Sequence, residues 1–269
     1  MNPARIRTIV VKEFLEVRQT LGTLVPVAIM AAVSIAIPLG LAVGIPWLTG
    51  EDLSSDADFR RAVGAATDLP AIRALGGHAG VQAFILQQFL LFFVLIPVTA
   101  AMSLAAYSII GEKQNRTLEP LLATPLSTAE LLIAKVFAAI LPALAIEAAA
   151  LAVYFAGIAW LAEPGVAGAL LTVRTLLLVA LVGPLAGLVG LQLAVLTSSR
   201  VNDPRSAQQI GVLVILPVVG VLVAQFAGVF WLTVPVMLTI AASLAVVWLG
   251  LLGLGVRLFD RESILTRWK

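Results

Sequence analysis

The chain has 269 residues, of which 61% are apolar and only 12% are charged, against roughly 25% charged residues in an ordinary soluble domain. Lipid is therefore expected to be its main solvent. The absence of cysteine and the single histidine, His78, exclude a disulfide framework, a thiolate site and most metal clusters. No catalytic residue, metal site, phosphate-binding Gly-x-x-x-x-Gly-Lys-Ser/Thr loop or nucleic-acid partner is expected on this chain.

Residues 1–20 combine charge with helical periodicity. Apolar side chains fall on one side of a 3.6-residue helix, at Ile6, Ile9, Val10, Phe14, Val17 and Leu21. Charged or amide side chains fall on the other side, at Arg5, Arg7, Lys12, Glu16, Arg18 and Gln19. The pattern predicts an amphipathic interfacial helix that lies along the membrane surface. The alternative is a solvated tail before the first span.

Long apolar runs follow, and a spanning helix needs roughly 20 such residues. Four runs suit one crossing each: Leu21–Trp47, Val81–Ile110, Leu131–Leu161 and about Leu170–Leu196. Pro26 and Pro38 are expected to kink the first. The run Ile210–Val256 is too long for one crossing and should form two helices, broken near Gln225–Pro235. We therefore predict an all-α membrane protein with six transmembrane helices in one domain, residues 21–269.

The distribution of lysine and arginine predicts the orientation. Thirteen of the 17 basic residues fall on the side that holds both termini, and four fall on the other side: Arg60, Arg61, Arg73 and Arg174. Basic residues accumulate on the cytoplasmic side. We therefore expect a multi-pass protein of a bacterial or archaeal inner membrane with both termini, including the tail at about 257–269, in the cytoplasm. The acidic polar loop at about 50–80 would be extracytoplasmic, with His78 in a flexible turn.

The polar connection at about 111–130 carries the most specific pattern. It reads Gly-Glu-Lys-Gln-Asn-Arg-Thr-Leu-Glu-Pro-Leu-Leu-Ala-Thr-Pro-Leu-Ser from Gly111 to Ser127. Leu118, Leu121 and Leu122 can form one apolar ridge flanked by charged side chains. A charged element with an apolar ridge, placed between long spans, is suited to docking against a soluble protein.

This segment resembles the type-2 permease subunits of the ATP-binding-cassette (ABC) exporters. In that family, a Glu-x-x-x-x-Thr-Leu-Glu-x-Leu-Leu-x-x-Pro-Leu-Ser segment follows the second span, and this chain matches it from Glu112 to Ser127. The family often has glycine before Thr-Leu-Glu, where this chain has Arg116. The amphipathic N-terminal helix, the polar loop after the first span and the six predicted spans extend the resemblance over the whole chain.

The resemblance implies a mechanism and partners. The segment would be a cytoplasmic coupling helix between spans two and three that sits in a groove of a separate ABC ATPase. Two ATPase copies, which bind ATP and Mg, would drive this chain and a second copy of it or a similar permease. No cofactor is expected on this chain. The contact with the ATPase would be made by Glu112, Arg116, Leu118, Glu119, Leu121 and Leu122.

Three polar residues inside the predicted spans are candidates for the translocation path: Gln87, Gln88 and Glu147. An ionised carboxylate at the centre of a span costs roughly 2.5 to 3.5 kcal/mol even on a lenient insertion scale. Glu147 must therefore face protein or water, or be neutral. It could line the path or hold a cation, or it could hydrogen-bond to Gln87, Gln88 or Gln192.

Two other functions compete with that of an ATP-driven exporter subunit. An ion-coupled secondary carrier would use Glu147 as its proton or sodium site, but no matching halves with broken, charged helices are visible. An intramembrane enzyme is disfavoured because one carboxylate cannot supply both a general acid and a general base.

Overall fold

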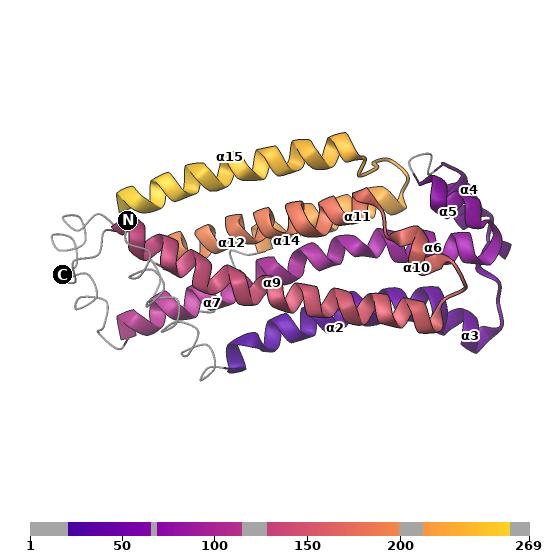
Figure 1. Ribbon diagram of the computed structural model, residues 1–269, viewed down its shortest axis with the longest axis horizontal. Helices are drawn as coiled ribbons and strands as arrows, with labels where there is room; N and C mark the ends of the chain where they lie inside the picture. The colour runs from indigo at the N-terminus through magenta and orange to yellow at the C-terminus, as the bar shows by residue number, and fades with distance from the viewer. Residues whose placement is uncertain (1–20, 66–68, 115–127, 199–211, 259–269) are drawn as a thin grey trace.

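The structure, a computed structural model, describes residues 21–65, 69–114, 128–198 and 212–258 (Figure 1). All regular secondary structure in these ranges is helical. The predicted interfacial helix at 1–20 and the tail from 259 onward lie outside the described residues. Most helices run along the long axis of the molecule, and short helices gather at one end (Figure 1).

The first span is one continuous helical run with a change of winding near its end. It consists of η1 Leu21–Leu24, α2 Val25–Leu39, the π-helix η2 Gly40–Gly44 and α3 Ile45–Thr49. Pro26 lies in the first turn of α2, where a missing N–H costs no hydrogen bond, and Pro38 lies inside α2, so the kinks at both positions stay predictions. The winding also changes before Pro46, which cannot donate to the carbonyl four residues earlier.

The segment predicted as a polar loop is a small helical cap, defined here as η3 Leu53–Ser55, α4 Ala57–Ala65 and α5 Pro70–Leu75. Leu69 and Ile72 are buried against the bundle. The loop prediction was therefore wrong in part, because two or three apolar side chains among the charges were enough to anchor short helices. The cap lies at one end of the bundle, at the right in Figure 1. We call this the cap end.

The second span is the central helix of the bundle. It runs through α6 Gly77–Phe89, the 3-10 segment η4 Leu90–Val94 and α7 Leu95–Gln114. Of its apolar window, 89% is buried, which makes it the most enclosed of the candidate spans. It begins four residues before the predicted start, because Gly77 to Gly80 form the first turn of α6.

The third span is α9 Thr128–Leu161, which is close to the predicted range. A turn and α10 Val166–Leu170 lead to the fourth span, made of α11 Val173–Leu177, the π-helix η5 Leu178–Val182 and α12 Gly183–Ser198. Side chains of α7 and α9 approach the glycines of α12 so closely that a Cβ at Gly183, Gly187 or Gly190 would lie 2.8 to 3.2 Å from one of their atoms. Small residues at this spacing allow close packing of spanning helices.

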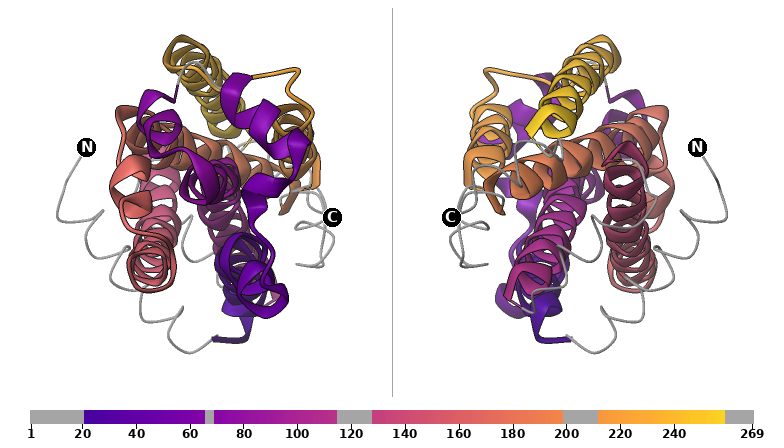
Figure 2. Two further views of the ribbon diagram at one scale, coloured as in Figure 1. Left: turned by 90° about the vertical axis from the view of Figure 1, so that its right-hand side faces the viewer. Right: turned by 90° about the vertical axis from the view of Figure 1, so that its left-hand side faces the viewer.

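The last apolar run is broken as predicted, between α14 Val212–Phe226 and α15 Val234–Leu258. Within the part of the chain that the structure describes, five helical runs are long and apolar enough to cross a membrane. The described part of α14 has 15 residues, which is shorter than one crossing, so the sixth span stays a prediction. Only 11% of the window of α15 is buried, and this helix stands at the edge of the bundle in both end views (Figure 2).

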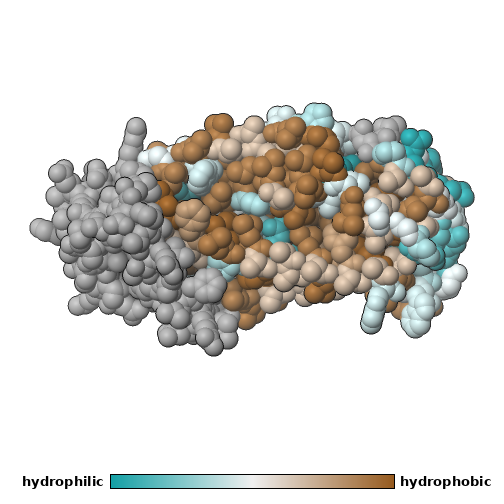
Figure 3. Space-filling view, in the orientation of Figure 1, coloured by the Kyte–Doolittle hydropathy of each residue, from teal (hydrophilic) through white to brown (hydrophobic). Residues whose placement is uncertain are grey.

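The surface agrees with a membrane protein. Apolar side chains form a broad band around the middle of the visible face, and hydrophilic side chains gather at the cap end (Figure 3). Exposed apolar side chains lie along α2, α9 and α15, among them Ile29, Val153, Trp160, Val246 and Leu249. An apolar surface of this extent exceeds what a soluble monomer exposes.

Candidate functional site

The predicted coupling contact falls largely outside the described residues. Glu112 lies in the last turn of α7. Arg116, Leu118, Glu119, Leu121 and Leu122 belong to the range 115–127, which the structure does not describe. The end of α7 and the start of α9 lie at the end of the bundle opposite the cap (Figure 1). The connection therefore starts and finishes at the end of the bundle opposite the cap, and a coupling segment is expected at that end. Its helical form stays a prediction.

Glu147 lies at the middle of α9, fourteen residues from either end of the apolar window Ile133–Leu161. Its side chain is 3% exposed. The carboxyl faces α12, where its Oε1 atom would lie 2.8 Å from a Cβ added to Gly183. Within the described residues, Oε1 has no hydrogen-bond partner. The contact places a lone carboxyl against the backbone of the neighbouring span.

Two of the three glutamines of α6, Gln87 and Gln88, have other partners. Gln87 Oε1 lies 3.5 Å from the Thr175 hydroxyl, which donates more closely to the Leu170 carbonyl at 2.6 Å. Gln88 Oε1 accepts a hydrogen bond of 3.2 Å from the side-chain amide of Gln225 in α14. The two side chains therefore face different helices, as their adjacent positions require.

The hydrogen bond from Glu147 to a glutamine such as Gln87, Gln88 or Gln192, one of the alternatives that the sequence leaves open, is not formed. Gln87 and Gln88 are engaged elsewhere, and the buried amide of Gln192 has no partner among the described residues. The contacts of Gln87, Gln88 and Glu147 are made with three different elements, α11, α14 and the start of α12. Their assignment to a translocation path stays a prediction.

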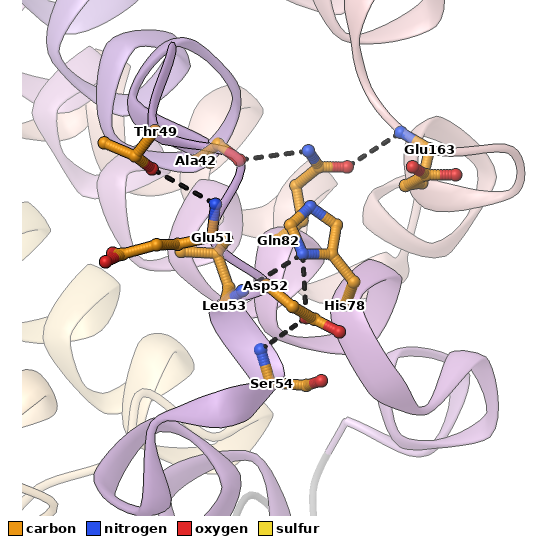
Figure 4. A network of polar contacts seen from close by, with 9 residues as sticks. All are labelled: Ala42, Thr49, Glu51, Asp52, Leu53, Ser54, His78, Gln82 and Glu163. Atoms are coloured by element: carbon orange, nitrogen blue, oxygen red, sulfur yellow. Dashed lines mark hydrogen bonds and ion pairs between the residues drawn. The ribbon is translucent and has the colours of Figure 1, made fainter. Parts of the chain in front are cut away.

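Gln82, which the sequence did not single out, joins three segments at the cap end (Figure 4). Its Nε2 donates to the Ala42 carbonyl at 3.0 Å, and its Oε1 accepts from the backbone N–H of Glu163 at 2.7 Å. The Ala42 carbonyl is available because Pro46, four residues later, has no N–H. Gln82 thus fastens α6 to the first span and to the turn after α9.

Tyr154 makes a similar contact deeper in the bundle. Its hydroxyl donates to the Leu86 carbonyl at 2.9 Å. At the start of the 3-10 segment η4, the N–H of Leu90 bonds to the carbonyls of Gln87 and Gln88 and not to that of Leu86. The change of helix winding therefore leaves the Leu86 carbonyl without its backbone donor, and the hydroxyl of Tyr154 in α9 donates to it.

His78 is in the first turn of α6, so the predicted flexible turn is wrong. Its Nδ1 lies 3.1 Å from the backbone nitrogen of Leu53 and 3.0 Å from Asp52 Oδ1 (Figure 4). One nitrogen cannot accept from Leu53 and donate to Asp52 at once, so its protonation state selects the partner. The pKa of Asp52 is lowered chiefly by the hydrogen bond from the Ser54 backbone and then by the Ser54 side chain, with His78 adding less.

A cavity of about 380 Å³ opens at the cap end. It is lined by Ser54, Arg60, Val63, Gly64, Arg73, Gly77 and Val81. Both arginines are exposed, and a guanidinium group that stays in water holds an anion weakly because solvent and salt screen it. We assign no ligand to this cavity.

The residues that the sequence interpretation missed share a recognisable signal. Gln82 and Tyr154 are polar groups in apolar runs, and each bonds to a carbonyl freed by proline or by a change of helix winding. A proline inside one span predicts such a carbonyl. Which polar side chain reaches it depends on packing, which the sequence does not show.

Comparison with known families gives one match over most of the chain. A family model described as ABC-2 family transporter protein matches residues 7–234. The matched range contains the 111–130 segment, Gln82 and Glu147. No curated protein matches the chain significantly.

Proposed function

The chain belongs to the ABC-2 family of transporter proteins, and we propose that it forms the translocation path of an ATP-driven exporter whose ATPase is a separate polypeptide. As a membrane component of this family, the protein is a multi-pass transport subunit without a catalytic domain. ATP and Mg would bind to the partner. The match over residues 7–234 carries the proposal.

The position of the 111–130 segment supports docking of the ATPase through it. Of the described helices, α7 ends and α9 begins at the end of the bundle opposite the cap, with Glu112 in the last turn of α7 (Figure 1). An ATPase bound between them would contact the ends of two spans that pack against α12. When the ATPase closes around ATP, its movement could then be transmitted to the centre of the bundle as a rigid-body shift.

The exposed apolar faces support assembly with a second permease. Windows of the first span and of α15 are only 17% and 11% buried in the isolated chain. Lipid covers part of these faces, and a second copy or a similar permease would cover the rest. The family match favours this arrangement over the ion-coupled carrier and the intramembrane enzyme considered from the sequence.

Gentle purification of the tagged chain from its own membranes tests the proposal. We expect an ABC ATPase to accompany it in stoichiometric amount and the complex to hydrolyse ATP in a vanadate-sensitive manner. A chain that purifies alone, with no ATP hydrolysis under conditions that keep known ABC complexes intact, would refute the proposal.

Charge reversal within the segment tests the docking contact. Glu119→Arg should weaken ATPase association while the spans stay folded, because it reverses a charge in the proposed contact. Glu51→Arg, at the exposed edge of the cap end, is the matched control and should leave association unchanged. Equal association of both variants would remove Glu119 from the contact.

A further inference from the structure

The contact between Glu147 and Gly183 lies at a break in the hydrogen bonding of the fourth span. The N–H of Gly183 donates to Leu178, five residues back, and so misses Val179, its usual acceptor. Pro184 has no N–H and cannot donate to Ala180. The carbonyls of Val179 and Ala180 therefore both lose the donor that a regular α-helix supplies.

The first span contains the same backbone arrangement and shows how it is completed. In η2, the N–H of Ile45 donates to Gly40, five residues back, and Pro46 follows. The carbonyl freed by Pro46 belongs to Ala42, and it accepts a hydrogen bond of 3.0 Å from the side-chain amide of Gln82. A polar side chain from the neighbouring span thus replaces the missing backbone donor.

At η5, the polar side chain against the turn is Glu147. Its Oε1 lies beside Gly183 and has no partner among the described residues. An ionised carboxylate only accepts hydrogen bonds, so it cannot serve a freed carbonyl. A protonated carboxyl carries one O–H donor and can do at η5 what the amide of Gln82 does at η2.

We propose that Glu147 and the carbonyls freed at η5 form a proton-binding site at the centre of the membrane. The bound proton stays on the carboxyl, and the resulting O–H donates to the carbonyl of Val179 or Ala180. This site goes beyond the proposed function and does not depend on the ATPase.

A proton fits this site better than a metal ion. Calcium and magnesium take about six or more oxygen ligands, which is more than the one carboxyl and two backbone carbonyls of the proposed site would supply. The described residues contain no cluster of three or more His, Cys, Asp or Glu side chains that could hold a metal.

Charged groups of the surrounding helices lie far from the site. On α9, Lys135 precedes Glu147 by twelve residues, which is about 18 Å along a helix. On the fourth span, Arg174 precedes Gly183 by nine residues, about 13 Å. From Leu95 to Ala105, the buried part of α7 has no titratable side chain, and Tyr154 of α9 donates to Leu86.

Loss of the proton has a structural consequence. An ionised Glu147 would repel the two freed carbonyls and have no compensating charge in the close contact with Gly183. Ionisation therefore requires that α9 and α12 separate enough to admit water or a cation. The proposal thus couples proton release to a movement at the interface of the third and fourth spans.

Infrared spectroscopy of the purified chain in lipid tests the site directly. We expect a carboxylic-acid C=O band at neutral pH that disappears in Glu147→Gln and moves on ¹³C labelling of glutamate side chains. Glu163→Gln, in the exposed turn after α9, is the matched control and should leave the band unchanged. The absence of any acid band sensitive to Glu147→Gln would overturn the proposal.

A second variant keeps the test decisive if the glutamine variant does not fold. Glu147→Asp retains a carboxyl on a shorter side chain, so the acid band should persist at a shifted frequency. A spectrum of Glu147→Asp identical to that of the wild-type protein would also overturn the proposal. Because the measurement needs no ATPase, its failure is distinct from failure of the exporter assignment.

Discussion

The turns around η2 and η5 have the same backbone arrangement and different side-chain partners. Each is a five-residue π-helix followed by one residue and a proline. Near the cap end, the freed carbonyl of Ala42 meets an amide, which donates at any pH. At the middle of the membrane, the freed carbonyls meet a carboxyl, which donates only when protonated. The same backbone arrangement can therefore accept a hydrogen bond that holds two helices together at any pH, or one that forms only when a carboxyl is protonated.

Removing the side-chain hydrogen bonds of Gln82 at η2 should have the largest effect on stability. Gln82→Met keeps the side-chain volume but leaves the Ala42 carbonyl and the Glu163 N–H without partners. The buried carbonyl of Ala42 left unsatisfied costs about 1–3 kcal/mol. We expect a clearly lower midpoint of thermal unfolding in detergent, measured from the loss of the monodisperse size-exclusion peak.

Gln88→Met is the matched control for this variant. It removes one bond to the side chain of Gln225, which can adjust, so its midpoint should fall less. Equal midpoints for Gln82→Met and Gln88→Met would show that the three-way contact of Gln82 adds nothing.

Adding a methyl group at Gly183, beside η5, should lower the midpoint of thermal unfolding by an intermediate amount. In Gly183→Ala, the new Cβ would lie 2.8 Å from Glu147 Oε1, and overpacking of this kind costs about 1–3 kcal/mol. Gly253→Ala, in α15 with open space around it, should keep or raise the midpoint. The double variant Gly183→Ala/Glu147→Ala should lose less than the sum of the single variants. Identical midpoints for the two glycine variants would contradict the close contact.

The smallest expected effect is the dependence of the stability of the cap on pH. The pKa of Asp52 lies below its ordinary value of 3.8, mainly because the Ser54 N–H bonds to the carboxylate. The contribution of the ionised Asp52 carboxylate to the stability of the cap is therefore complete above pH 3.8. It is lost as the pH falls through the lower pKa that Asp52 has in the folded state. The amide proton shift of Ser54, followed by NMR, should titrate below pH 3.8 and become flat in Asp52→Asn. A midpoint at or above 3.8 would contradict the capping contact.

The long spans could be predicted because their cause is local. A run of apolar residues such as Leu131–Leu161 needs a helix in lipid whatever its neighbours are, and the excess length of Ile210–Val256 demanded a break. The cap was missed because its helices depend on a few apolar contacts, such as those of Leu69 and Ile72, that the sequence pattern does not reveal. The glycines around His78 are poor helix formers and therefore predict a turn there.

The sequence by itself determined an all-helical membrane protein, the position of most helices and the segment that resembles the ABC permeases. These properties follow from the cost of exposing backbone groups or charges to lipid, which each stretch of chain meets on its own. Only the tertiary structure decided that Glu147 lies against Gly183, that Gln82 reaches Ala42, and that Gln87 and Gln88 bond elsewhere. The partner of a buried polar group depends on which helices pack together and at what rotation, and residues far apart in the sequence fix both.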